Sequence, residues 1–125
     1  MESRRDHALL FDGDCGFCRL ATKAALRLDE DERLRAVAIQ SEEGQRLLTE
    51  VPAERRLDAF HLVTPGGIVL TGPDAAAPLS RLLRGGRVPA RAMRRFPAET
   101  ARAYGFVSRH RGLLGRLGIR ARSVD

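Results

Sequence analysis

Short apolar runs alternate with segments of helical periodicity in the first third of the chain. The apolar run at residues 7–11 ends at Asp12 and Gly13, which predicts a buried strand that leads into a turn. Over residues 15–28 the apolar positions recur at helical spacing and the basic side chains fall on the opposite side, so we expect a helix there. Residues 34–39 predict a second strand. A helix between two strands indicates a parallel βαβ unit with a right-handed crossover.

A short helix and a hairpin are expected next. Ser41 is a suitable N-cap for a helix that runs to about residue 48. The apolar runs at residues 59–63 and 68–70 flank a turn that contains one proline and two glycines, which predicts an antiparallel hairpin. A helix over residues 75–84 follows, and a pair of glycines stops it.

The order of these elements is β-α-β-α-β-β-α, which is typical of a thioredoxin-like α/β core with a mixed four-stranded sheet. We assign residues 1–86 to this core. Residues 87–125 are expected to form a basic helical C-terminal extension that packs on the same single domain, with helices at residues 88–95 and 98–117. The second of these helices carries an apolar stripe made of Ala101, Tyr104, Val107, Leu113, Leu114 and Leu117.

The composition is that of a globular protein with one core. The chain has 125 residues, of which 43% are hydrophobic and 30% are charged. No apolar stretch reaches the roughly 18 residues of a membrane-spanning helix, and the first residues lack the apolar region of a signal peptide. We therefore expect a cytoplasmic protein. Thiols are kept reduced there, so two nearby cysteines serve catalysis or metal binding rather than a structural disulfide.

The two cysteines, Cys15 and Cys18, stand at the start of a predicted helix. Their spacing puts the sulfurs one helical turn apart, so a disulfide between them needs little backbone movement. Cys15 lies nearest the helix N-terminus, where free N–H groups and the helix dipole favour a thiolate. We therefore predict thiol-disulfide exchange, in which Cys15 is the nucleophile that forms a mixed disulfide and Cys18 is the resolving thiol.

Three charged residues flank the cysteine pair. Asp14 opposes a thiolate at Cys15 and Arg19 assists it, so their net effect stays open. Asp12, at the strand end, could lie near Cys18 and accept its proton when Cys18 attacks. Equally, Asp12 or Asp14 could simply cap the turn and the helix. The sequence supports both roles.

Metal binding is the main alternative for the cysteines, since two cysteines at this spacing form half of many zinc sites. The other half is missing, because there is no second cysteine pair and His7, His61 and His110 are far apart in the sequence. We expect neither a metal nor a bound organic cofactor.

The acidic turn also imitates the start of haloacid-dehalogenase-type phosphatases, with Asp12 as nucleophile. Such enzymes need a later lysine, and the single lysine, Lys23, comes too early.

Asp12, Cys15 and Cys18 form a D-x-x-C-x-x-C pattern that resembles the signature of the DCC family of predicted thiol-disulfide oxidoreductases. Later similarities to this family lie at residues 72–76 and at Tyr104, Arg109 and Arg111. The resemblance implies a thioredoxin-like fold and disulfide exchange through the cysteine pair.

The chain departs from well-studied thioredoxins just before the third predicted strand. Those proteins carry a cis-proline there that shapes the substrate groove, whereas residues 57–59 contain no proline and Pro52 comes too early. In the C-terminal motif of the family, Gly112 stands where an aromatic residue is common. Site roles for Tyr104 and Arg111 therefore stay open.

The net charge of +6 is distributed unevenly. Residues 1–80 carry ten basic and fourteen acidic side chains, whereas residues 81–125 carry twelve arginines and two acidic residues. Arginines alternate with apolar residues and glycine over residues 108–122, which could make a surface for anionic lipid or an acidic partner. We favour packing of these arginines on the acidic half of the same molecule. Few aromatic residues and no reader motif argue against specific nucleic-acid binding.

The expected function is enzymatic exchange of disulfides, with a disulfide-containing protein or a small thiol as substrate. Reduction, oxidation and redox sensing are all compatible with the pattern. The alternative is a non-catalytic binding module, in which the cysteine pair forms a regulatory disulfide or binds a metal and the Arg-rich tail docks a partner.

Overall fold

The computed structural model describes residues 6–111 and residue 113. Its strands are β1 (His7–Phe11), β2 (Leu34–Ala38), β3 (His61–Val63) and β4 (Val69–Thr71). Its helices are α1 (Gly16–Leu28), α2 (Glu42–Leu47), α3 (Pro73–Leu82), α4 (Arg87–Arg95) and α5 (Pro97–Arg109), with a short 3-10 helix, η1 (Ala53–Asp58). Leu114 and Leu117 of the expected apolar stripe lie outside the described residues, as does most of the arginine-rich segment 108–122.

The four strands form one mixed sheet in the order β2-β1-β3-β4. The central strand β1 pairs parallel with β2 and antiparallel with β3, and β3 pairs antiparallel with β4. The β1-α1-β2 unit and the β3-β4 hairpin are therefore both as predicted, and the predicted fold class is confirmed: the sheet and its helices are consistent with a thioredoxin-like core.

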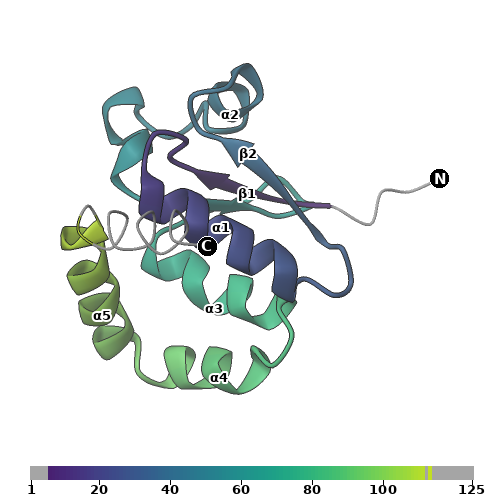
Figure 1. The fold of residues 1–125 in the computed structure, drawn as a ribbon, viewed down its shortest axis with the longest axis vertical. Helices are drawn as coiled ribbons and strands as arrows, with labels where there is room; N and C mark the ends of the chain where they lie inside the picture. Colours follow the sequence, from purple (N-terminus) through teal and green to yellow (C-terminus); the bar gives the residue numbers. More distant parts are fainter. Residues whose placement is uncertain (1–5, 112, 114–125) are drawn as a thin grey trace, which may run out of the picture.

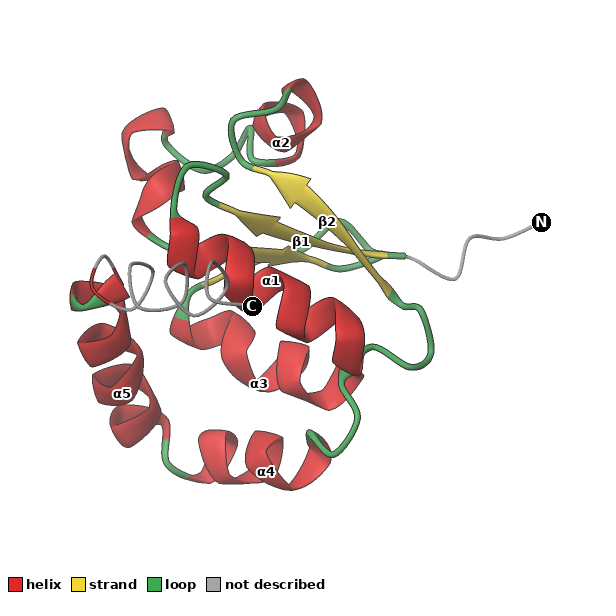
Figure 2. Cartoon of the chain, viewed as in Figure 1, coloured by secondary structure: helices red, strands yellow, loops and turns green. Residues whose placement is uncertain are grey.

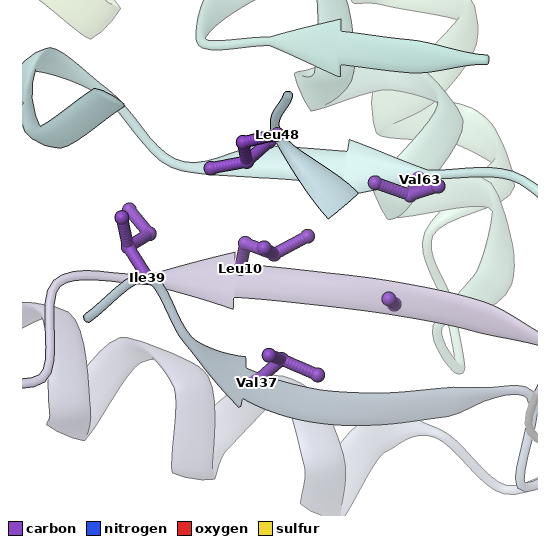
Figure 3. Packing of buried hydrophobic residues seen from close by; sticks show 6 residues of the cluster. Leu10, Val37, Ile39, Leu48 and Val63 are labelled. Atoms are coloured by element: carbon purple, nitrogen blue, oxygen red, sulfur yellow. The ribbon is translucent and has the colours of Figure 1, made fainter. Parts of the chain in front are cut away.

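Successive residues of β1 enter two separate hydrophobic cores, one on each face of the sheet. Leu10 belongs to the core on the α2 side, and Figure 3 shows it with its labelled neighbours. These neighbours are Val37, Ile39, Leu48 and Val63. Leu9 belongs to the other core, with residues of α1 and α3, and Figure 2 shows these two helices on the face opposite α2. A strand covered on both faces needs a continuous apolar run, which explains the pattern at residues 7–11.

The helix α3 has other bounds than the sequence predicts, and one short helix is not predicted at all. The helix α3 begins at Pro73 rather than at residue 75, because proline is well suited to the first turn of a helix, where its missing N–H is not needed. It ends at Leu82, before the glycine pair. The 3-10 helix η1 was not predicted, since it has no buried residue and hence no apolar periodicity to indicate it.

The helices α4 and α5 follow the core and pack back onto it. The helix α4 lies along α3, and Ser80 Oγ donates a hydrogen bond of 2.8 Å to the carbonyl of Gly86, just before α4 begins. The helix α5 contacts both α4 and α3, and Figure 1 shows it beside the first turns of α3. Within the described part of the chain, no helix is both long and apolar enough to cross a membrane.

Candidate active site

The turn between β1 and α1 is held by the carboxylate of Asp12. Its Oδ1 accepts hydrogen bonds from the backbone N–H of Asp14 at 2.9 Å and from Gln40 Nε2 at 2.7 Å. Gln40 Oε1 accepts a further hydrogen bond, of 3.0 Å, from the N–H of Gly13. Gln40 lies just beyond the end of β2, which is paired in parallel with β1. The turn that precedes the cysteines is therefore held by hydrogen bonds to a residue just beyond the end of the neighbouring strand β2.

Cys15 is the N-cap residue of α1. Its backbone is extended (φ −98°, ψ 119°), and its Sγ accepts a hydrogen bond of 3.3 Å from the N–H of Cys18. The sulfur thus takes the place that a serine or aspartate oxygen takes at other N-caps. Free N–H groups and the helix dipole interact favourably with negative charge at this position. The guanidinium of Arg19 donates to the carbonyl of Gly13 at 2.8 Å and so links the first helical turn to the loop.

Cys18 has a different environment from Cys15. Burial raises the pKa of the half-buried Cys18 thiol to about 12, and the hydrogen bond and charge of Cys15 act in the same direction. The Arg111 guanidinium lowers this pKa, and the Asp12 carboxylate raises it. Cys18 is therefore a protonated thiol at neutral pH. Both cysteines are free, and their side chains are close enough to interact directly.

The structure brings together the three residues that the sequence singled out. Asp12 accepts a hydrogen bond of 3.2 Å from the Cys15 N–H through its carbonyl, and its carboxylate acts electrostatically on Cys18. Asp14, the alternative cap, is exposed, and only its backbone N–H is engaged with Asp12. The carboxylate that caps the turn is thus the same one that lies near Cys18.

An apolar cavity of about 240 Å³ opens beside Cys18. It lies between α1, the central strand β1 and the helix α5 of the extension. Cys18 is part of its wall, whereas Cys15 is not. The wall includes Phe17 and Ala21 of α1, Phe60 before β3, and Tyr104 and Val107 of α5. The C-terminal extension therefore helps to form the surroundings of the second cysteine.

Tyr104 and Phe60 connect the extension to the core at this cavity. Their ring centroids are 5.8 Å apart and their planes meet at 40°. Burial raises the pKa of Tyr104, while a backbone hydrogen bond with Phe60 and the charge of Arg111 act in the opposite direction. Arg111 lines the same cavity and donates a hydrogen bond of 3.4 Å to the carbonyl of Leu57. Tyr104 and Arg111, whose roles the sequence left open, thus both lie near Cys18.

Sequence reasoning missed two residues of the site, Gln40 and Phe60. Gln40 could have been found, because the ends of neighbouring parallel strands meet at the same edge of a sheet and Gln40 follows the second strand. Phe60 gives no such signal. An aromatic residue before a strand normally indicates only core packing, and its contact with Tyr104 depends on how α5 returns to the core.

The three histidines lie in separate places. His61 is fully buried between Thr71 Oγ1, at 2.9 Å from its Nδ1, and the Arg56 carbonyl, at 2.8 Å from its Nε2. His7 contacts Asp6, and His110 contacts the carbonyl of Phe106. Among residues 6–111 and 113, no three His, Cys, Asp or Glu side chains are grouped so that they could hold a metal ion.

Comparison with known proteins agrees with the geometry of the cysteine pair. No curated protein and no solved structure matches the chain. A protein-family profile does match, that of the DCC1-like thiol-disulfide oxidoreductases, and it covers residues 9–117. The match includes both cysteines, all of the sheet except the first two residues of β1, and the helices α4 and α5. The chain therefore belongs to the DCC1-like thiol-disulfide oxidoreductase family.

Proposed function

We propose that the protein is an enzyme that exchanges disulfides through Cys15 and Cys18, with Cys15 as the nucleophile. The observation that carries this assignment is the asymmetry of the two sulfurs. Cys15 Sγ caps α1 and receives an N–H hydrogen bond, whereas Cys18 is a half-buried thiol with a raised pKa. Nucleophilic attack requires a thiolate, so the capping sulfur is the better first nucleophile.

In the reductive direction the reaction has two steps. The Cys15 thiolate attacks one sulfur of a substrate disulfide, the substrate S–S bond breaks, and the leaving thiolate takes up a proton. Cys18 then loses its proton and attacks Cys15 Sγ, which forms the Cys15–Cys18 disulfide and releases the second substrate thiol. Two electrons pass from the enzyme dithiol to the substrate disulfide. The reverse sequence oxidises a dithiol substrate.

We assign the proton transfer of the second step to Asp12. A thiol whose pKa is raised to about 12 needs a base in order to attack at neutral pH. The Asp12 carboxylate is close enough to affect that pKa, and Gln40 and the N–H of Asp14 fix its orientation. Its Oδ1 carries both of these hydrogen bonds, which leaves Oδ2 to accept a proton.

The test uses wild-type protein, Cys15→Ser and Cys18→Ser in exchange with insulin and with glutathione disulfide. We expect both substitutions to abolish turnover and only Cys18→Ser to accumulate a mixed disulfide, detected by mass spectrometry. Ala24→Ser, an exposed change on α1 outside the cavity, is the matched control and should keep full activity. Turnover by Cys15→Ser would refute the assigned nucleophile.

The same experiment separates the enzyme from a binding module with a regulatory disulfide or a metal. A module would form the Cys15–Cys18 disulfide without turning over either substrate. The metal content of protein purified under reducing conditions tests the other alternative. One metal ion per protein, absent from both serine variants, would refute the enzymatic function in favour of a metal site. A disulfide-containing protein or a small thiol as substrate, and a cytoplasmic location, remain part of the proposal.

A further inference from the structure

The cavity beside Cys18 has the position and the chemistry of a substrate subsite. It opens next to the sulfur that attacks in the second step of the proposed reaction, and its wall is mostly apolar. Its volume of about 240 Å³ is below the roughly 300–1,000 Å³ of pockets for drug-sized ligands or cofactors. A small apolar cavity of this size suits an aliphatic chain.

Arg111 adds a positive charge to this otherwise apolar site. Arg111 is a partly buried residue that lines the cavity, and its charge lowers the pKa values of both Cys18 and Tyr104. Its hydrogen bond to the Leu57 carbonyl is long, at 3.4 Å. Among the described residues, no carboxylate lies within ion-pair distance of it. A partly buried arginine with no carboxylate partner among the described residues favours a ligand that brings a carboxylate.

We propose that the cavity binds an aliphatic chain that ends in a carboxylate, as part of a low-molecular-weight disulfide substrate. The apolar wall from α1 and α5 takes up the chain, Arg111 pairs with the carboxylate, and the disulfide lies at the cysteine pair. This inference rests on the proposed disulfide exchange only for the reacting end of the ligand. The chain and the carboxylate bind whether or not the sulfurs react.

The covalent steps are those of the proposed function with this substrate in place. Cys15 attacks one sulfur of the substrate disulfide, the substrate S–S bond breaks, and a mixed disulfide and one free thiol form. Cys18 then attacks Cys15 Sγ, and the second substrate thiol is released while the enzyme keeps the disulfide. One equivalent of reduced enzyme therefore reduces one equivalent of substrate, and a single turnover needs no further reductant.

Binding is tested first, without any sulfur chemistry. Octanoate, an aliphatic chain with a carboxylate, is titrated into the reduced full-length protein by calorimetry, and octanol serves as the neutral chain. We expect octanoate to bind and octanol to bind about tenfold more weakly, because octanol lacks the charge-assisted hydrogen bond to Arg111. Arg111→Gln should weaken octanoate binding to the level of octanol.

Two alanines on α1 provide a matched pair of variants. Ala21 lines the cavity and is exposed, so Ala21→Leu places its larger side chain at the cavity without crowding the core. Ala24 is also exposed but does not line the cavity. We expect Ala21→Leu to abolish octanoate binding and Ala24→Leu to leave it unchanged. Equal binding by Ala21→Leu and Ala24→Leu, or no octanoate binding by wild type, would refute the proposal.

Reduction of a matching substrate is tested second. Lipoate carries a cyclic disulfide, an aliphatic chain and a carboxylate, whereas hydroxyethyl disulfide has neither the chain nor the charge. We expect single-turnover reduction of lipoate to be at least about tenfold faster than that of hydroxyethyl disulfide. Ala21→Leu should remove this preference, and Ala24→Leu, outside the cavity, should keep it. If octanoate binds but neither disulfide is reduced, the proposed disulfide exchange is refuted and the proposed binding site is retained. Reduction of both at equal rates would refute the subsite alone.

Discussion

At the scale of single residues, the two cysteines differ because of where the helix starts. The N-cap position gives Cys15 an N–H donor, whereas the first turn places Cys18 against the cavity and half-buries it. The CxxC spacing alone predicts which sulfur is nearer the helix N-terminus. It does not predict the raised pKa of Cys18, because that pKa is raised by burial, by Cys15 and by Asp12, and is lowered by Arg111 of the C-terminal extension.

The first prediction concerns Asp12→Asn. Asparagine Oδ1 can keep both hydrogen bonds of the turn, so the substitution removes the charge and the base while the geometry stays. Loss of the negative charge lowers the pKa of Cys18, yet loss of the base should slow the attack of Cys18 on the mixed disulfide about a hundredfold. Rapid-mixing kinetics of mixed-disulfide decay measure this step.

The control for this prediction is Asp14→Asn, which removes an exposed negative charge from the same turn. We expect Asp14→Asn to resolve its mixed disulfide within about twofold of wild type, since its carboxylate accepts no proton in the proposed step. Faster resolution by Asp12→Asn would mean that the carboxylate acts only by repelling the Cys18 thiolate. That result would refute the assignment of Asp12 as the base.

The second prediction concerns His61 and the pH dependence of stability. The Arg56 carbonyl accepts from Nε2–H, so the neutral ring receives the Thr71 hydroxyl at Nδ1, and burial lowers the pKa of His61 below 6.5. As the pH falls through 6.5, a histidine in the unfolded chain takes up a proton while folded His61 stays neutral. The free energy of unfolding should therefore fall below pH 6.5, by at most about 1.4 kcal/mol per pH unit from this group.

His61→Gln isolates this contribution. Glutamine keeps a donor and an acceptor but does not titrate, so the free energy of unfolding of the variant should depend less steeply on pH between about 7 and 5. All other groups are the same in both proteins, so their contributions cancel in the comparison. Urea denaturation at several pH values gives the two slopes. Parallel slopes for wild type and variant would contradict the prediction.

At the scale of secondary-structure elements, the sequence predicts those helices and strands whose position is determined by a local hydrophobic pattern or by turn and capping residues. The strand β1, the helix α1 and the Ser41-capped helix α2 were predicted within one or two residues, because an apolar run, a helical period and a capping residue each leave a local signal. The 3-10 helix η1 was missed, since its side chains are not buried and it follows no period.

The glycine pair after α3 shows a role that the sequence did not indicate. Gly85, three residues after the last residue of α3, has a positive φ of 73°, which glycine adopts without steric cost. Gly86 has ordinary dihedral angles, and its constraint is steric: a Cβ there would lie 1.7 Å from the Ser80 carbonyl oxygen. The second glycine therefore allows the start of α4 to approach α3 closely.

The third prediction follows from this contact. Gly86→Ala forces the start of α4 away from α3, since the clash is with backbone rather than with a flexible side chain. We expect the free energy of unfolding to fall by at least about 2 kcal/mol in urea denaturation. Gly66→Ala, in the hairpin turn, has no tight neighbour and a permissive φ, so it should change stability by less than about 0.5 kcal/mol. Equal effects of the two substitutions would contradict the steric role of Gly86.

At the scale of the whole molecule, the site joins parts that are distant in the sequence. The motif residues come from the first β-α unit, Gln40 from the end of the second strand, and Tyr104 and Arg111 from the extension. The sequence predicted the first group because the residues are contiguous. It could not predict the cavity, because the cavity exists only where α5 packs back on α3 and on Phe60.

The last prediction tests whether residues 87–125 belong to the same cooperative unit as residues 1–86. Tyr104 is the single tyrosine and the sequence has no tryptophan, so tyrosine fluorescence reports on the docking of α5 alone. The half-buried ring packs on Phe60, and losing its contacts exposes the cavity wall to water. We therefore expect tyrosine fluorescence and far-ultraviolet circular dichroism to change at the same urea concentration, as for one two-state domain. A tyrosine transition at lower urea, with most helical signal retained, would instead show that the extension unfolds separately from the core.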